Sequence, residues 1–247
     1  MGRKYRDPPI VEAVCEFRFE PSAPWDLTIP GLIYEKLKED FHKKRPVKLQ
    51  ELRIETSPAG FEQTFGTSDG MRFLREDEKT FIQVAQNILS ANHVKPYSNW
   101  ESFLPFIHQA FETYKEVAKP NGIRRIGLRY INRIEIPGSP IKIEDYLHFY
   151  PFVASHLPQM FGNFLAAIET HYDESRDILK LQAGSAPVQT PGRVGIILDL
   201  DYFLTQPGGV PMDSVFEWVA LAHDRVEEVF EGCITDLLRE MFEEVKA

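Results

Sequence analysis

The stretch "GIRRIGLRYINRIEIP" at residues 122–137 decides the fold, because it alternates apolar and polar residues as a β-strand does. Successive side chains of a strand point to opposite faces of a sheet. Arg125, Arg129 and Arg133 then share one face, and from Ile126 to Ile136 the other face is apolar apart from Asn132. The pattern therefore predicts a half-buried strand that carries a row of arginines on its polar face.

Further strands and helices are expected on both sides of this stretch. The segment 10–20 alternates in the same way, helical spacing covers 29–41, and a second helix runs from Ser98 or Ser102 to Lys119. Short strands separated by "TSDG" and "DEK" are predicted within 51–94. After residue 137 we expect a short helical piece at 142–150, strands at 163–173, 178–184 and 192–204, and a long helix at 213–244.

This order of elements predicts an α+β fold with an antiparallel sheet and helices packed on one face. The segments 1–120 and 121–247 each read strand, helix, three strands, helix, which indicates an internal duplication in pattern. The two halves are expected to form one compact unit.

Composition and charge exclude several classes of protein. The chain has 28 Lys+Arg and 37 Asp+Glu, and a net charge of −9 disfavours generic DNA coating. The sequence contains no apolar run long enough for a membrane helix and no signal peptide, so a cytoplasmic protein is expected. Cys15 and Cys233 fall in apolar patterns and are predicted to be reduced core residues.

Two interpretations of the arginine row stay open. In the first, Arg125, Arg129 and Arg133 form ion pairs with acidic residues of neighbouring strands. In the second, they bind a small anion or RNA, because guanidinium groups suit bidentate contact with phosphate or carboxylate. Asn132 lies on the apolar face, where a buried amide hydrogen-bonds to the backbone or contacts a ligand.

A metal-dependent alternative rests on acidic residues in two later strands. Asp199 and Asp201 share one face of the strand 192–204, while Glu169, His171 and Asp173 share one face of the strand 163–173. Carboxylates and imidazoles of this kind hold Mg²⁺ or Mn²⁺ for phosphoryl transfer. A nuclease or related enzyme would need these residues to converge on one divalent ion, and no other cofactor is predicted.

The last helix carries a long apolar stripe that predicts packing across the sheet, or part of an interface with a second copy or another protein. His223 adjoins this stripe beside Trp218 and Asp224. It is expected to be a partly buried structural histidine or, alternatively, a proton-transfer or ligand-binding residue.

Three segments resemble a sporadically distributed family of uncharacterised bacterial proteins of about this length. They are "YRDPPIVEAVCEFRF" (5–19), "GLRYINRIEIP" (127–137) and "AHDRVEEVFEGCITDLLREMF" (222–242), and the resemblance covers essentially the whole chain. It brings no reaction, ligand or functional residue. Sporadic distribution implies mobile genes of accessory or defence systems.

Glycine-rich phosphate loops, nucleophile elbows and zinc-protease motifs are missing from the sequence. The leading hypothesis is therefore a noncatalytic binding or regulatory component that senses a small anionic ligand or binds a protein partner. A metal-dependent nuclease and an RNA-binding protein remain the alternatives.

Overall fold

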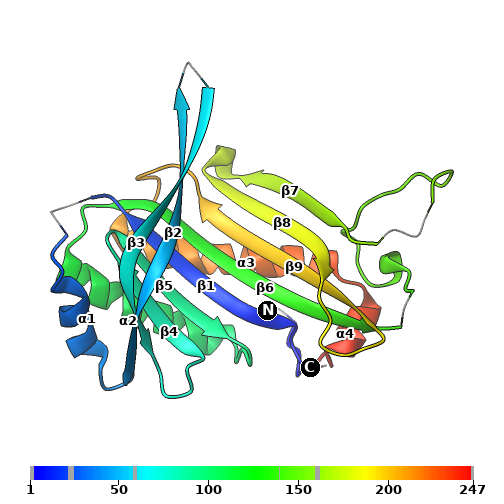
Figure 1. Ribbon diagram of the computed structural model, residues 1–247, viewed down its shortest axis with the longest axis horizontal. Coiled ribbons are helices and arrows are strands. Elements are labelled where there is room, and N and C mark those ends of the chain that lie inside the picture. The colour runs from blue at the N-terminus through cyan, green and yellow to red at the C-terminus, as the bar shows by residue number, and fades with distance from the viewer. Residues whose placement is uncertain (1–2, 22–24, 58–59, 139, 159–161, 246–247) are drawn as a thin grey trace. The chain divides into compact units, whose positions relative to one another are not determined.

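The computed structural model describes residues 3–21, 25–57, 60–138, 140–158 and 162–245, and gives the backbone alone for residues 50–57 and 60–66. The helices and strands are β1 (Ile10–Phe19), α1 (Ile29–Leu37), β2 (Lys43–Ser57), β3 (Gly60–Leu74), β4 (Thr80–Ala85), β5 (Ile88–Val94), α2 (Trp100–Ala118), β6 (Ile123–Pro137), β7 (Leu165–Tyr172), β8 (Asp177–Ala186), β9 (Arg193–Leu204), α3 (Val215–Cys233) and α4 (Asp236–Met241). Within the described residues, nine antiparallel strands hydrogen-bond in the order β2-β3-β4-β5-β1-β6-β9-β8-β7 (Figure 1). The predicted α+β class with an antiparallel sheet is confirmed.

The chain divides into two compact units. The N-terminal unit contains Cys15–His93 and Ser98–Arg124, and the C-terminal unit contains Met1–Val14, Val94–Tyr97 and Arg125–Ala247. Strands β1 and β6 run through both units. Where the sequence suggested a division after residue 120, the first fourteen residues belong to the C-terminal unit.

Aromatic side chains build the core of the N-terminal unit. The alternation of β1 places Phe17 and Phe19 on its buried face, and both rings contact α2. The ring of Phe17 lies 4.9 Å from that of Phe111, and the ring of Phe19 stacks on Tyr114 at 4.5 Å between centroids. Such pairs add to the stabilisation that burial of the rings already gives.

Helix α2 begins between the two serines that the sequence offered as its start. Asn99 is the N-cap, and its side-chain oxygen accepts a hydrogen bond from the backbone N–H of Ser102 at 2.9 Å. Pro105 therefore lies inside the helix, beyond the first turn.

The segment "TSDG" is part of β3 and does not form a turn. Gly70 pairs with Ala85 of β4, and a Cβ atom at Gly70 would lie only 2.6 Å from the carbonyl oxygen of Val84. The glycine thus permits close approach of two strands. The strands predicted before and after "TSDG" are thus one strand, whereas β2 and β5 are additional, so that β1 and α1 are followed by four strands among the described residues, one more than in the predicted repeat.

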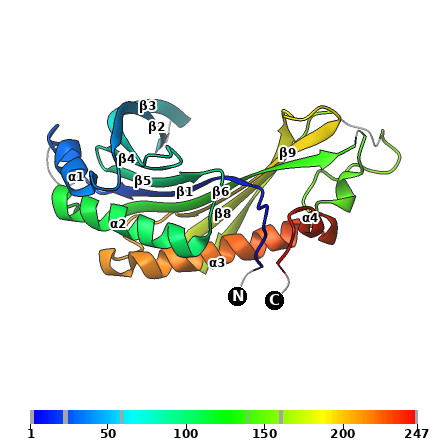
Figure 2. The same cartoon turned by 90° about the horizontal axis from the view of Figure 1, so that it is seen from below.

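The C-terminal unit packs α3 against one face of β6, β8 and β9 (Figure 2). The Trp218 ring of α3 lies 5.5 Å from the Tyr202 ring of β9, with Ile134 and Leu200 buried on the same face. The first and last described segments lie side by side, since the backbone N–H of Val245 donates to the carbonyl oxygen of Lys4 at 2.8 Å (Figure 1).

The predicted single helix over 213–244 is wrong. Helix α3 ends at Cys233, and Ile234 is extended with φ −107° and ψ 148°. Ile234 forms a β-bridge with Leu147, and the Thr235 N–H donates to the Tyr146 carbonyl at 3.0 Å. The β-branched residues Ile234 and Thr235 therefore pair with the segment 146–147, and this pairing interrupts the helix. Helix α4 begins after Thr235.

Candidate functional site

Two of the three predicted arginines form ion pairs with β9. Arg129 grips Asp199 with two atoms: Nε donates to Oδ1 at 2.8 Å, and Nη2 donates to Oδ2. Arg125 Nη2 lies 3.4 Å from Asp201 Oδ2, and its guanidinium covers the ring of Phe203 at 4.7 Å. The cross-strand ion pairs expected from the sequence are present at both positions.

Arg133 has different partners. Its Nη2 donates to the carbonyl oxygen of Pro187 and lies 3.5 Å from Glu135 of its own strand. Glu135 in turn accepts a hydrogen bond from the backbone N–H of Gln189 at 2.7 Å. This hydrogen bond lowers the pKa of Glu135, so the carboxylate stays charged beside Arg133.

Asn132 lies on the opposite, buried face of β6 and is 1% exposed. Its side-chain NH₂ donates to the carbonyl oxygen of Leu198 at 3.1 Å, as expected for an amide that bonds to the backbone. Its Oδ1 atom has no hydrogen-bond partner among the described residues.

The proposed metal ligands lie on strands that are not neighbours. Glu169 and His171 belong to β7, whereas Asp199 and Asp201 belong to β9, and β8 separates the two strands. Adjacent strands are about 4.8 Å apart, so the backbones of β7 and β9 are separated by two such spacings, roughly 10 Å in total. Lys180 of β8 pairs in register with both Glu169 and Asp201. Within the described part of the chain, no three His, Cys, Asp or Glu residues form a group able to hold a metal ion.

His223 of α3 is partly buried and takes part in a chain of polar contacts. Its Nδ1 lies 3.3 Å from the Tyr130 hydroxyl, which in turn lies 3.3 Å from the Tyr97 hydroxyl. The chain of contacts links α3 to β6 within the C-terminal unit. It positions His223 on the helix-covered face of β6, away from the arginines.

Sequence reasoning missed a buried carboxylate, Asp177, at the first residue of β8. This side chain is 0% exposed and accepts hydrogen bonds from Trp218 Nε1 at 3.0 Å, the Tyr202 hydroxyl at 3.1 Å and Arg176 Nη2 at 2.6 Å. Burial and then the charge of Asp177 raise the pKa of Tyr202, which keeps the phenol protonated as a donor. The three donors join α3 to β8 and β9.

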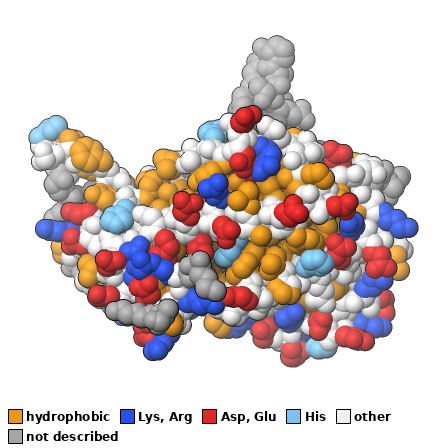
Figure 3. Space-filling model, turned by 180° about the vertical axis from the view of Figure 1, so that it is seen from behind, with side chains coloured by type: hydrophobic (Ala, Val, Ile, Leu, Met, Phe, Trp, Pro, Cys, Tyr) orange, Lys and Arg blue, Asp and Glu red, His pale blue; other side chains and the backbone are white. Residues whose placement is uncertain are grey.

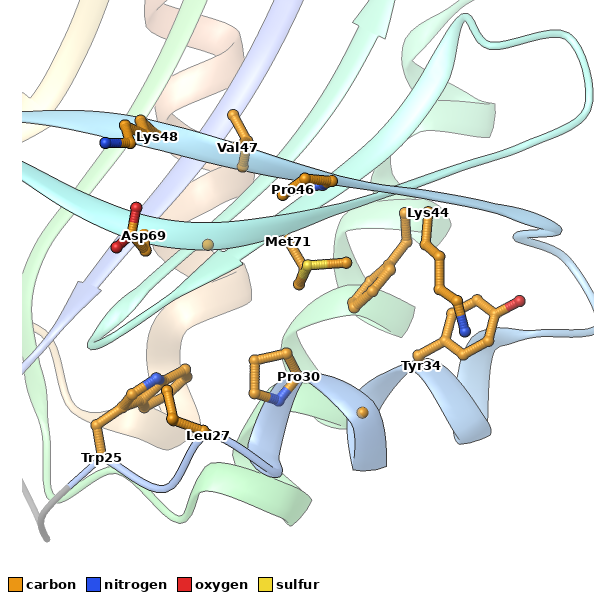
Figure 4. A pocket seen from close by; sticks show the side chains of 13 residues that line it. Trp25, Leu27, Pro30, Tyr34, Lys44, Pro46, Val47, Lys48, Asp69 and Met71 are labelled. Carbon is orange, nitrogen blue, oxygen red and sulfur yellow. The ribbon is translucent and has the colours of Figure 1, made fainter.

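Sequence reasoning also missed an open groove in the N-terminal unit. It has a volume of about 720 Å³ and lies between α1 with its preceding segment and the strands β2 and β3 (Figure 4). Most lining side chains are apolar or aromatic: Trp25, Leu27, Pro30, Tyr34, Pro46, Val47, Met71 and Phe73. We call this site the α1 groove.

Three charged side chains also line the α1 groove. Lys44 and Lys48 each lie two residues from Pro46 along β2, one on either side, and share its face, and Asp69 of β3 is the register partner of Lys48. Figure 4 shows Lys44 and Tyr34 together, with Lys48 and Asp69 farther along the strands and Met71 between. The Lys44 Nζ atom is 4.2 Å from the centroid of the Tyr34 ring.

Both cysteines are free and buried, as predicted. Burial raises the pKa of Cys233 to about 12 and raises the pKa of Cys15 as well. Neither thiol is therefore appreciably ionised near neutral pH.

Acidic and basic side chains intermingle on the face shown in Figure 3. No helix within the described residues has the length and apolar character needed to cross a bilayer. Models of known protein families and curated protein sequences give no match to this chain.

Proposed function

We propose that this protein is a noncatalytic binding protein whose α1 groove takes a small ligand with an apolar body. The observation that carries the proposal is the groove itself, an open volume of about 720 Å³ with predominantly apolar and aromatic lining. Ligand sites of soluble proteins commonly have volumes of about 300–1,000 Å³ and a few polar groups among apolar side chains. The α1 groove has both properties.

Packing supports a groove that exists before the ligand binds. Phe73 at its base is 1% exposed and its ring lies 5.4 Å from the Tyr34 ring, so the walls rest on the core of the N-terminal unit. By contrast, Leu27 at the rim is 87% exposed. Covering such a surface with a ligand removes apolar area from water without unfolding any part of the wall.

We infer that the protein has a regulatory or accessory role in the cell, in which binding of the ligand controls its association with a protein partner. The resemblance to a sporadically distributed bacterial family motivates this step. Capture of the ligand-loaded and ligand-free protein from the native host, with comparison of the copurified chains, would test it. Identical partners in both states would contradict control by the ligand.

Gly31 offers a direct test of the groove. It lines the groove from α1, and a Cβ atom added there meets no heavy atom within 4 Å. Gly31→Trp is therefore expected to fill the groove while leaving the fold intact. Binding can be followed with N-phenyl-1-naphthylamine, a neutral dye that brightens on entering an apolar site.

We expect saturable dye binding to the wild type and its loss in Gly31→Trp. Leu32→Trp is the matched control, because Leu32 is exposed on the same helix but does not line the groove. Circular dichroism and urea unfolding would establish that all three chains are folded. Equal dye binding by wild type and Gly31→Trp would contradict the proposed site.

A further inference from the structure

The two ends of the α1 groove differ in charge. At one end, Lys48 and Asp69 are register partners on neighbouring antiparallel strands. Opposite charges at such positions attract each other, so this end is close to neutral. The other end carries Lys44, which gives the groove an excess of one positive charge.

Lys44 is available to a ligand. Among the described residues it forms no ion pair, and its Nζ atom instead lies over the face of the Tyr34 ring at 4.2 Å. The charge of Lys44 acts weakly on Glu35, but the Oε2 atom of Glu35 already accepts a hydrogen bond from Lys38 Nζ at 2.6 Å, which is the main cause that lowers the pKa of Glu35. A cation–π contact at an exposed site is weaker than a charge-assisted hydrogen bond to a carboxylate.

The apolar side chains between the two ends suit a hydrophobic body. Pro30 of α1 and Met71 of β3 face the space between Tyr34 and Trp25 (Figure 4). Methionine and aromatic side chains accept flat or aliphatic groups of varied shape. A ligand that places its body here can bring an anionic group to the Lys44 ammonium.

We infer that the α1 groove selects a small amphipathic anion, with an aromatic or aliphatic body and one carboxylate, and that Lys44 binds the carboxylate. This inference rests on the proposed function. It adds the chemical class of the ligand and identifies Lys44 as the residue that binds its negative charge.

A pair of matched probes separates charge from shape. Naphthalene-2-carboxylate and naphthalene-2-carboxamide have nearly the same size, and only the first is anionic at pH 7.5. Titration calorimetry on the full-length protein is expected to show about tenfold tighter binding of the carboxylate, as one charge-assisted contact predicts. High salt should reduce this preference.

Lys44→Met keeps most of the apolar stem and removes the charge. It should reduce the carboxylate affinity about tenfold and leave the carboxamide affinity unchanged. Lys79→Met is the matched control, because Lys79 is an exposed lysine in the turn before β4 and does not line the groove. A preference for the carboxylate that survives in Lys44→Met would overturn the role of Lys44.

Asp69→Asn distinguishes the two lysines. If Lys48 were the anion-binding residue, removing its acidic partner would strengthen carboxylate binding severalfold, and Lys44→Met would have little effect. We expect the opposite order of effects. Equal binding of both probes by the wild type would refute the anionic ligand class while the binding function stands. Binding of neither probe, together with no dye binding, would refute both.

Discussion

The polar face of β6 and β9 and the α1 groove are both lined by charged side chains, but they use them differently. On the polar face, Arg129 and Arg125 are engaged by Asp199 and Asp201. In the α1 groove, Lys44 rests on an aromatic ring and the surrounding apolar surface lies open. The paired charges of the polar face stabilise the folded state. The open apolar surface beside the Lys44 cation favours the binding of a ligand.

A ligand would meet different free-energy terms in the two places. An anion that bound Arg129 would have to displace the bidentate carboxylate of Asp199, whose side chain is 11% exposed. Such displacement leaves a poorly solvated negative charge behind. A ligand in the α1 groove displaces only water and the weak contact between Lys44 and Tyr34.

The strongest test of a structural role for charge in the C-terminal unit is Asp177→Asn. The amide cannot accept all three hydrogen bonds from Trp218, Tyr202 and Arg176, and it loses the charge-assisted contact. We expect a loss of about 2 kcal/mol in the free energy of unfolding, measured by urea denaturation.

Asp173→Asn provides the control, because Asp173 binds the same Arg176 at 2.9 Å from an exposed position. Asparagine also tolerates the left-handed backbone at residue 173, where φ is 48°. Its expected cost is within about 0.5 kcal/mol. Similar losses in the two variants would show that burial of Asp177 does not matter.

The next test concerns the ion pair on the polar face itself. A double-mutant cycle with Arg129→Met and Asp199→Asn should give a coupling energy of about 1 kcal/mol in stability, because the contact is bidentate but half-exposed. Salt at 1 M should reduce that coupling. A coupling energy indistinguishable from zero would contradict the structural role of Arg129 and favour the second interpretation of the sequence, in which Arg129 binds an anion or RNA.

Periodicity predicted the faces of the strands well, and it predicted their partners in part. The alternation in β6 assigns Arg129 to the polar face and Tyr130 to the buried face, and the same rule applied to β9 suggests Asp199 as a partner. Arg133 escaped this reasoning, because its partner is the carbonyl oxygen of Pro187, a loop group without a sequence signal.

The α1 groove could not be predicted because its walls come from separate segments. Trp25, Lys44 and Met71 meet only when α1 packs against β2 and β3. The sequence also predicted a turn at "TSDG", which would have placed Asp69 in the turn and Met71 in the strand that follows it. Gly70 instead allows β3 to approach β4 closely. A local sequence pattern does not distinguish a glycine in a turn from a glycine at a close contact between strands.

In the groove, a small change should stabilise the fold without closing the site. Gly31→Ala removes glycine from the first turn of α1 and adds a methyl group in open space. We expect a gain of about 0.5–1 kcal/mol in the free energy of unfolding. Dye and carboxylate binding should persist, in contrast to Gly31→Trp. Loss of binding in Gly31→Ala would show that the groove requires a flexible α1.

The smallest expected effect concerns the Tyr97–Tyr130–His223 chain. Its two hydroxyl contacts are both 3.3 Å long, at the weak end of hydrogen-bond geometry. Tyr130→Phe should therefore reduce stability by only about 0.5 kcal/mol, since the ring and its packing remain. The variant should bind both naphthalene probes as the wild type does, because these residues belong to the C-terminal unit and the groove to the N-terminal unit. Altered probe affinity in Tyr130→Phe would show that the two units are energetically coupled. It would then support the alternative that His223 affects ligand binding.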